Sequence, residues 1–314
     1  VGESGCGKSV TAMSILGLVA APGVIESGEI LLAPAAGAAA SDPVDLVSLA
    51  EPHLRKVRGG RIGMIFQEPM TSLNPVFTIG DQIAEAVRLH RPVSRAVARA
   101  RALEMLELVR MADPQRRLDE YPHQLSGGMR QRVVIAMALA CDPDLVIADE
   151  PTTALDVTIQ AQILDLLAAL RRRLGTAILL ITHDLGVVAE TCDDVAVMYA
   201  GRIVERAPAA MLFKTPLHPY TIGLLAARPG SVGRSGNGRN AAPLRTIPGM
   251  VPAPQNFPSG CRFHPRCAYA RTPECGATVP ELREVSPGHF VRCSYAEALG
   301  PPMPWEQLNG SLGG

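Results

Sequence analysis

Apolar runs alternate with segments of helical periodicity over roughly the first 228 residues. This alternation predicts an α/β domain with a parallel sheet. The expected strands are residues 61–67, 144–149, 177–182 and 194–199, and the expected helices are residues 9–20, 78–90, 94–111, 126–140 and 158–174. The pattern then changes. An Ala-rich loop is expected at 33–40, a Gly- and Ser-rich linker at 229–244, a Pro- and Cys-rich domain at 245–299, and a disordered tail at 300–314.

Polar side chains follow three of the predicted strands directly. Gln67 ends the first strand, Asp149 and Glu150 end the second, and His183 follows the third. In an open parallel sheet, ligands bind beyond the carboxyl ends of the strands. We therefore expect these residues to meet at one edge of the sheet. A lone histidine at a strand end is more often structural, and a lone Asp-Glu pair is usually a solvated turn, but the joint pattern favours a site.

The first nine residues have the spacing of a phosphate-binding loop that ends in a lysine and a hydroxyl residue. Such a pattern recurs by chance in about 1% of chains of this length. Its backbone N–H groups cradle phosphates, and the helix that follows points its positive end at the anion. We predict ATP or GTP binding by Gly2, Glu3, Ser4, Gly5, Cys6, Gly7, Lys8 and Ser9. Such a loop follows a buried strand, so we also expect the chain to be a fragment that lacks its first strands.

Phosphoryl-transfer chemistry suggests a role for each polar residue. Mg²⁺ prefers oxygen ligands, which Ser9, Gln67 and Asp149 can supply. Glu150 is predicted to be the general base that polarises the attacking water. His183 is predicted to hold Glu150 or the γ-phosphate.

A second anion-binding surface is predicted far from the phosphate-binding loop. Ser126 is expected to cap a long helix that begins with Gly127 and Gly128. Its separation along the chain suggests that it serves the nucleotide of another subunit. A capped helix after a turn is the alternative.

Composition removes several classes of protein. The 314 residues carry 30 basic and 30 acidic side chains, which counts weakly against nucleic-acid binding. The sequence contains no run of 18 apolar residues, which a membrane-spanning helix would need. Its seven cysteines are too few for a secreted disulfide scaffold. A cytosolic protein fits best.

The order of these motifs resembles the nucleotide-binding subunit of ATP-binding cassette (ABC) transporters. More narrowly, the chain resembles the oligopeptide/dipeptide permease ATPases in residues 67–75 (QEPMTSLNP), 216–220 (PLHPY), 247–249 (IPG) and 261–267 (CRFHPRC). Met129 departs from the glutamine that is commonest in the wider superfamily.

The resemblance implies a P-loop NTPase cassette over 1–228, with a helical subdomain at about 76–142, that hydrolyses ATP with Mg²⁺. It adds Asp156 to the nucleotide-binding residues. It implies a dimer of ATPase subunits, equal or different, which sandwiches two ATP molecules on the cytoplasmic face of the membrane. The expected partners are two permease subunits and, indirectly, an extracytoplasmic solute-binding protein, with no nucleic acid. The expected cargo is a peptide. Nickel or another solute, and a soluble non-transport ATPase, are the alternatives.

Four cysteines lie within the last domain, at Cys261, Cys267, Cys275 and Cys293. Their spacing is neither that of paired zinc ligands nor that of a ferredoxin, and it leaves a metal site and unrelated cysteines equally favoured. The family resemblance favours a structural [4Fe–4S] cluster over zinc.

Overall fold

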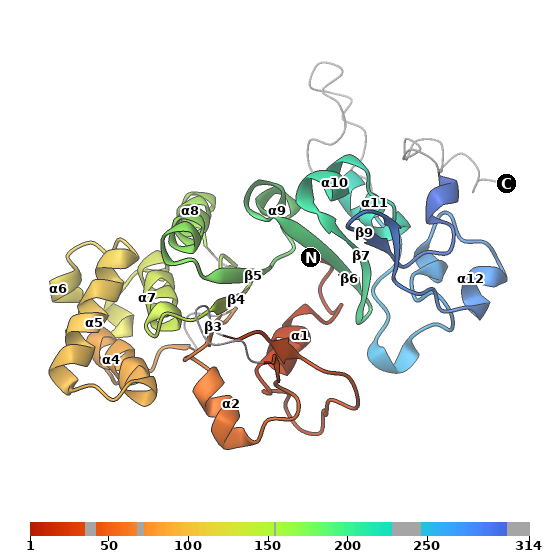
Figure 1. The fold of residues 1–314 in the computed structure, drawn as a ribbon. Helices are drawn as coiled ribbons and strands as arrows, with labels where there is room; N and C mark the ends of the chain where they lie inside the picture. Colours follow the sequence, from red (N-terminus) through yellow and green to blue (C-terminus); the bar gives the residue numbers. More distant parts are fainter. Residues whose placement is uncertain (35–41, 68–71, 154, 228–245, 300–314) are drawn as a thin grey trace, which may run out of the picture. The chain divides into compact units, whose positions relative to one another are not determined.

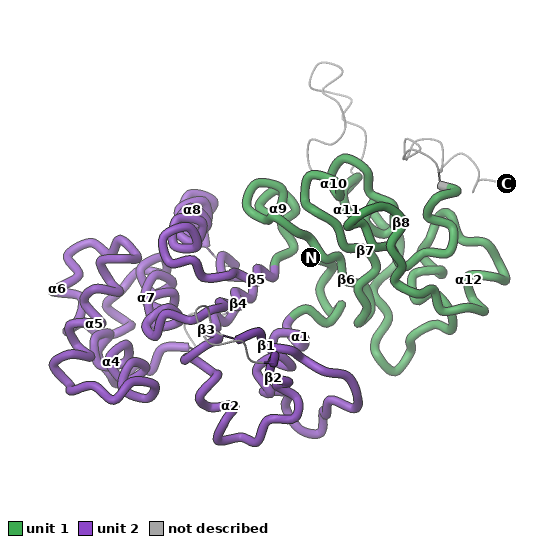
Figure 2. Tube along the Cα trace, in the orientation of Figure 1, with its two compact units in different colours: residues 1–8, 182–314 green, residues 9–181 purple. Residues whose placement is uncertain are grey.

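The computed structural model describes residues 1–34, 42–67, 72–153, 155–227 and 246–299 (Figure 1). The chain forms two compact units (Figure 2). Unit 1 comprises residues 1–8 and 182–314, and unit 2 comprises residues 9–181. Among the helices in these described ranges, none is long and apolar enough to cross a membrane.

Unit 2 contains a three-stranded parallel sheet in the order β3 (Ile62–Ile65), β4 (Leu145–Asp149) and β5 (Ala177–Ile181) (Figure 1). Ile65 pairs with Ala148, and Asp149 pairs with Ile181. The carboxyl ends of the three strands therefore share one edge, as the sequence predicts. A separate two-stranded antiparallel sheet joins β1 (Leu31–Leu32) to β2 (Val44–Asp45).

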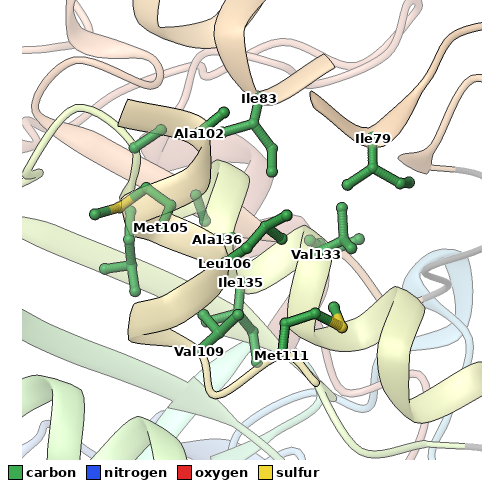
Figure 3. Close-up of a cluster of buried hydrophobic side chains, with 14 of the residues drawn as sticks. Ile79, Ile83, Ala102, Met105, Leu106, Val109, Met111, Val133, Ile135 and Ala136 are labelled. Carbon is green, nitrogen blue, oxygen red and sulfur yellow. The ribbon is translucent and has the colours of Figure 1, made fainter. Parts of the chain in front are cut away.

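The longer helices of unit 2 begin at residues with capping side chains. Thr78, Ser94 and Ser126 each accept a hydrogen bond from the first helical turn. The helices are α1 (Lys8–Ile15), α2 (Glu51–Val57), α4 (Ile79–His90), α5 (Arg95–Leu108), α6 (Pro114–Arg117), η1 (Pro122–Gln124), α7 (Gly127–Leu139) and α8 (Val157–Leu174). A buried apolar cluster joins α4, α5 and α7 (Figure 3), including Ile83, Leu106 and Ile135. Its burial holds the helical part to the sheet.

Unit 1 contains a four-stranded antiparallel sheet in the order β6 (Asp194–Tyr199), β7 (Arg202–Pro208), β9 (His289–Val291) and β8 (Arg283–Ser286). The remaining elements are α9 (Leu185–Thr191), α10 (Ala209–Lys214), α11 (Pro219–Ala226), η2 (Pro254–Asn256), η3 (His264–Arg266), α12 (Glu274–Ala277) and η4 (Ala296–Leu299). Glu205 of β7 pairs with Val291 of β9. The C-terminal region therefore extends a sheet that begins before residue 200.

The compact units divide the chain at a different position from the linker expected from the sequence, and the expected domains stay a prediction. The expected boundary lies at 229–244, whereas the compact units divide after Ile181. The pairing of β7 with β9 explains the difference, because it joins both sides of the expected linker in one sheet. The whole linker at 229–244 lies outside the described residues. So do the tail at 300–314 and most of the Ala-rich loop.

Candidate functional site

The phosphate-binding loop is held by its own lysine and by the adjacent strand. Lys8 is buried, and its Nζ donates to the carbonyl oxygens of Gly2 at 2.8 Å and of Glu3 at 3.2 Å. These two partners are carbonyls rather than carboxylates, so neither is an anion that competes with a phosphate. Gly2 has φ +152°, and a Cβ there would lie 2.2 Å from the carbonyl oxygen of Met198. Only glycine fits this approach.

The edge of the three-stranded sheet brings Gln67 and Glu150 together. Gln67 Nε2 donates to Glu150 Oε2 at 3.3 Å, and Thr153 Oγ1 donates to the same oxygen at 2.9 Å. Glu150 has φ 47°, a left-handed conformation that is uncommon for this residue type. Its backbone N–H is fixed by the carbonyl of Ile181 at 2.9 Å. The carboxylate predicted to be the base is thus held by Gln67, which follows β3, and by Thr153, which follows β4.

Oxygen donors suited to Mg²⁺ are present at the predicted positions. Asp149 is buried at the end of β4, and Ser9 is an exposed hydroxyl in the first turn of α1. With the amide of Gln67, this donor set matches the hard-ligand preference of the ion. His183 is exposed and follows β5, but it belongs to unit 1. Its contact with Glu150 therefore stays a prediction.

The residues predicted for the second anion-binding surface lie at the starts of two neighbouring helices. Ser126 Oγ caps α7 by accepting from the N–H of Met129 at 3.4 Å. Asp156 Oδ1 caps α8 by accepting from the N–H of Ile159 at 2.9 Å. A Cβ on Gly128 would lie 2.9 Å from Cγ2 of Ile159, so a larger residue there would push the two helices apart. The glycines of the predicted surface thus also serve close helix packing.

The predicted iron–sulfur ligands do not form a ready metal site. Burial raises the pKa of Cys267 to about 12, with smaller contributions from the other three thiols, and burial also raises the pKa of Cys261 and Cys293. Within the described residues, no three His, Cys, Asp or Glu side chains are grouped so as to hold a metal ion. The residues as arranged do not fit a bound cluster, because the thiols would have to approach one another and lose their protons.

Sequence reasoning missed two residues that contact the phosphate-binding loop. Tyr220 Oη accepts from the N–H of Glu3 at 2.8 Å, and the guanidinium of Arg266 forms an ion pair with the Glu3 carboxylate at 2.9 Å. The one available signal was Glu3 itself, because a carboxylate in a phosphate-binding loop calls for a nearby cation.

Comparison with known proteins agrees with this geometry. Residues 1–153 match the model of the family described as "ABC transporter", and residues 204–275 match "Oligopeptide/dipeptide transporter, C-terminal region". A putative peptide import ATP-binding protein of Brucella melitensis is 54% identical over 93% of this chain and 86% of its own length. The oligopeptide transport ATP-binding protein AppD of Bacillus subtilis is 50% identical over 96% of this chain and 87% of its own.

Two further proteins extend the comparison. The dipeptide transport ATP-binding protein DppD of Escherichia coli is 46% identical over 94% of this chain and 85% of its own. Among solved structures, the dimeric ATP-binding cassette MJ0796, in a post-hydrolysis state with ADP and Pi, matches with a TM-score of 0.56 at 30% identity, over 66% of this chain and 83% of its own. Because these relatives are matched over most of their length, the chain belongs to the ABC transporter ATP-binding proteins, in the group that carries the oligopeptide/dipeptide transporter C-terminal region.

Proposed function

We propose that this protein binds and hydrolyses ATP to drive peptide import through a membrane transporter. The observation that carries the proposal is the hydrogen bond between Gln67 and Glu150 at the carboxyl edge of the parallel sheet. It joins an amide suited to sense Mg²⁺ and water with a carboxylate suited to accept a proton. The peptide cargo is supported by the names of the relatives, which are peptide, oligopeptide and dipeptide transport proteins.

Each residue has a part in the proposed hydrolysis. The backbone of residues 2–7, Lys8 and the start of α1 bind the phosphates. Ser9, Gln67 and Asp149 would hold Mg²⁺, which would supply charge neutralisation at the phosphate oxygens. Glu150 accepts the proton of the attacking water, and the His183 imidazole orients Glu150 or the γ-phosphate.

The protein acts, we propose, as one half of an ATPase dimer at the cytoplasmic face of the membrane. Ser126, Gly127, Gly128 and Asp156 then face the nucleotide held by the partner subunit. The dimeric state of the solved cassette supports this arrangement. Two permease subunits transmit the motion, and an extracytoplasmic solute-binding protein delivers the peptide.

A [4Fe–4S] cluster on the four C-terminal cysteines is proposed from the family resemblance alone. Its formation requires the four thiols to converge and ionise from the arrangement described above. No step of the ATPase reaction depends on it.

The central test is peptide uptake in a strain that lacks this gene, with the wild-type gene or its Glu150→Gln variant added back. The variant keeps a hydrogen-bonding side chain but cannot accept the proton, so ATP hydrolysis falls by about 10²–10⁴-fold while ATP binding persists. Glu107→Gln, an exposed change on α5, is the matched control and retains uptake.

Two outcomes contradict different parts of the proposal. Unchanged ATP turnover in Glu150→Gln refutes the role of the base. Normal peptide uptake in the deletion strain refutes the peptide cargo, and uptake of nickel is then measured in the same strain.

A further inference from the structure

The phosphate-binding loop carries a charge that phosphate binding does not require. Glu3 occupies one of the four unspecified positions between Gly2 and Gly7. Its carboxylate places a negative charge in a loop that must attract a polyanion, which opposes binding unless a cation balances it. A partner for Glu3 is therefore of functional interest.

That partner is Arg266, from the Cys-rich C-terminal region. Its Nη1 donates to Glu3 Oε2 at 2.9 Å, and its Nη2 donates to Glu3 Oε1 at 3.0 Å. Such paired, parallel hydrogen bonds fix the carboxylate in position as well as balancing its charge. The Arg266 side chain is 6% exposed and that of Glu3 is 31% exposed, so solvent screens the pair only in part.

The guanidinium of Arg266 is itself held in a socket. Its Nε donates to the carbonyl of Pro248 at 2.7 Å, and its Nη2 also reaches the carbonyl of Gly249 at 3.2 Å. The ring of Tyr199 lies 5.7 Å from the guanidinium carbon. Arginine provides the planar fork that satisfies the carboxylate and the carbonyls together, and lysine does not.

Three different groups of Glu3 are fixed in this way. Arg266 binds the carboxylate, the buried Tyr220 accepts the backbone N–H at 2.8 Å, and the backbone carbonyl accepts from Lys8 Nζ at 3.2 Å. Tyr199, Tyr220 and Phe263 pack together behind this contact, with ring centroids 4.7–5.3 Å apart. All of these residues belong to unit 1 (Figure 2). A connected path therefore runs from the C-terminal region to the phosphate-binding lysine.

We infer that Arg266 is a positioning residue for ATP, through which the C-terminal region sets the shape and the charge of the phosphate-binding loop. Arg266 acts on the nucleotide through Glu3 and Lys8 rather than by touching it. Loss of the guanidinium leaves an unpaired carboxylate in the loop and frees the backbone that holds Lys8. This inference rests on the proposed ATP binding and deepens it.

The test is a double-mutant cycle on the full-length protein. For each variant we would measure the dissociation constant for MgATP, the KM and kcat of ATP hydrolysis, and the melting temperature. Arg266→Met removes the charge at similar volume and raises the dissociation constant and KM about tenfold or more, with a smaller effect on kcat. In Glu3→Gln the carboxylate is absent, so adding Arg266→Met to it changes ATP affinity much less. Arg266→Lys keeps a cation and gives an intermediate affinity, which covers the case in which Arg266→Met folds poorly.

Arg262→Met is the matched control. Arg262 lies in the same segment, stacks 3.9 Å from the Phe257 ring centroid, donates to the carbonyl of Ala200, and does not contact Glu3. The Arg262→Met variant is expected to leave ATP affinity unchanged. The inference is overturned if Arg266→Met binds ATP normally, if its effect is the same with Glu3 and with Gln at that position, or if Arg262→Met weakens ATP binding equally. Wild-type protein that binds no ATP refutes the proposed function instead.

Discussion

Glu205 offers the sharpest test of how the C-terminal region is attached to the rest of unit 1. Its side chain is fully buried on β7, and it accepts three hydrogen bonds. The donors are the backbone N–H groups of Leu217 at 2.7 Å and His218 at 2.9 Å, and Nε2 of His289 at 2.7 Å. One carboxylate therefore joins β7 to the segment before α11 and to β9.

The cost of removing Glu205 follows from these three donors. Glu205→Leu fills the space but leaves two N–H groups and a buried imidazole without an acceptor. Each such hydrogen bond contributes about 1.5–3 kcal/mol to the free energy of unfolding. The variant also avoids the cost of burying a carboxylate, and this gain offsets part of the loss. We expect a net loss of about 3–5 kcal/mol in the free energy of unfolding, which lowers the melting temperature by about 10 °C.

Thermal and urea unfolding of the full-length protein measure this loss. Glu205→Gln is expected to lose less than Glu205→Leu, because one oxygen still accepts while the amide NH₂ opposes the donor that faces it. Glu274→Gln, an exposed change on α12, is the control and stays within about 0.5 kcal/mol of wild type. A Glu205→Leu variant within about 1 kcal/mol of wild type would refute the reasoning.

Two further predictions concern protons and iron. Burial is the main cause that lowers the pKa of His218 from 6.5 to about 4, against the attraction of Glu205, so the unfolded chain binds a proton below pH 6.5 that the folded chain excludes. The contribution of neutral His218 to the free energy of unfolding is present above pH 6.5 and is lost as the pH falls towards 4, by about 2 kcal/mol between pH 7 and pH 5. In His218→Asn the amide oxygen can replace Nδ1 as the acceptor for the N–H of Tyr220, so this variant should lose the pH dependence. Denaturant midpoints measure it, and an unchanged pH dependence contradicts the assignment. Iron and sulfide analysis of anaerobically purified protein tests the proposed cluster. About four of each per chain, lost in Cys267→Ser, would support it, and protein with neither removes it.

Local signals in the sequence predicted the elements that carry the nucleotide site. Strands β3, β4 and β5 are short apolar runs, and each ends within two residues of its predicted end. Helices α4, α5 and α7 begin within one residue of their predicted starts, and Ser126 caps α7 as expected. Capping and hydrophobic periodicity depend on neighbours in the chain, so they are visible without the fold. The meeting of Gln67 with Glu150 followed from strand ends in the same way.

Strand β6 was predicted with the bounds it has, but β7, β8 and β9 of the same sheet were not predicted, for a physical reason. In β7, a charged residue occupies a fully buried position, because Glu205 is satisfied by donors 12 to 84 residues away. Its charge interrupts the apolar pattern by which a strand is recognised. The short β9 is stabilised by pairing with β7, and β8 by pairing with β9, rather than by their own composition. Nothing local to the sequence reveals those partners.

The same limit applies to the contact of greatest functional interest. Glu3 and Arg266 are 263 residues apart, so the motif spacing that revealed the loop could not reveal its partner. Together with the Glu205 network, this contact attaches the C-terminal region to the rest of unit 1 at two separate points, one at the phosphate-binding loop and one at β7. The two points make different predictions: loss of Glu205 should lower stability without a specific effect on ATP affinity, whereas loss of Arg266 should weaken ATP binding in a manner that depends on Glu3. A region that only completed the sheet would need the Glu205 network alone. The contact between Arg266 and Glu3 is therefore what connects this region to the phosphate-binding loop.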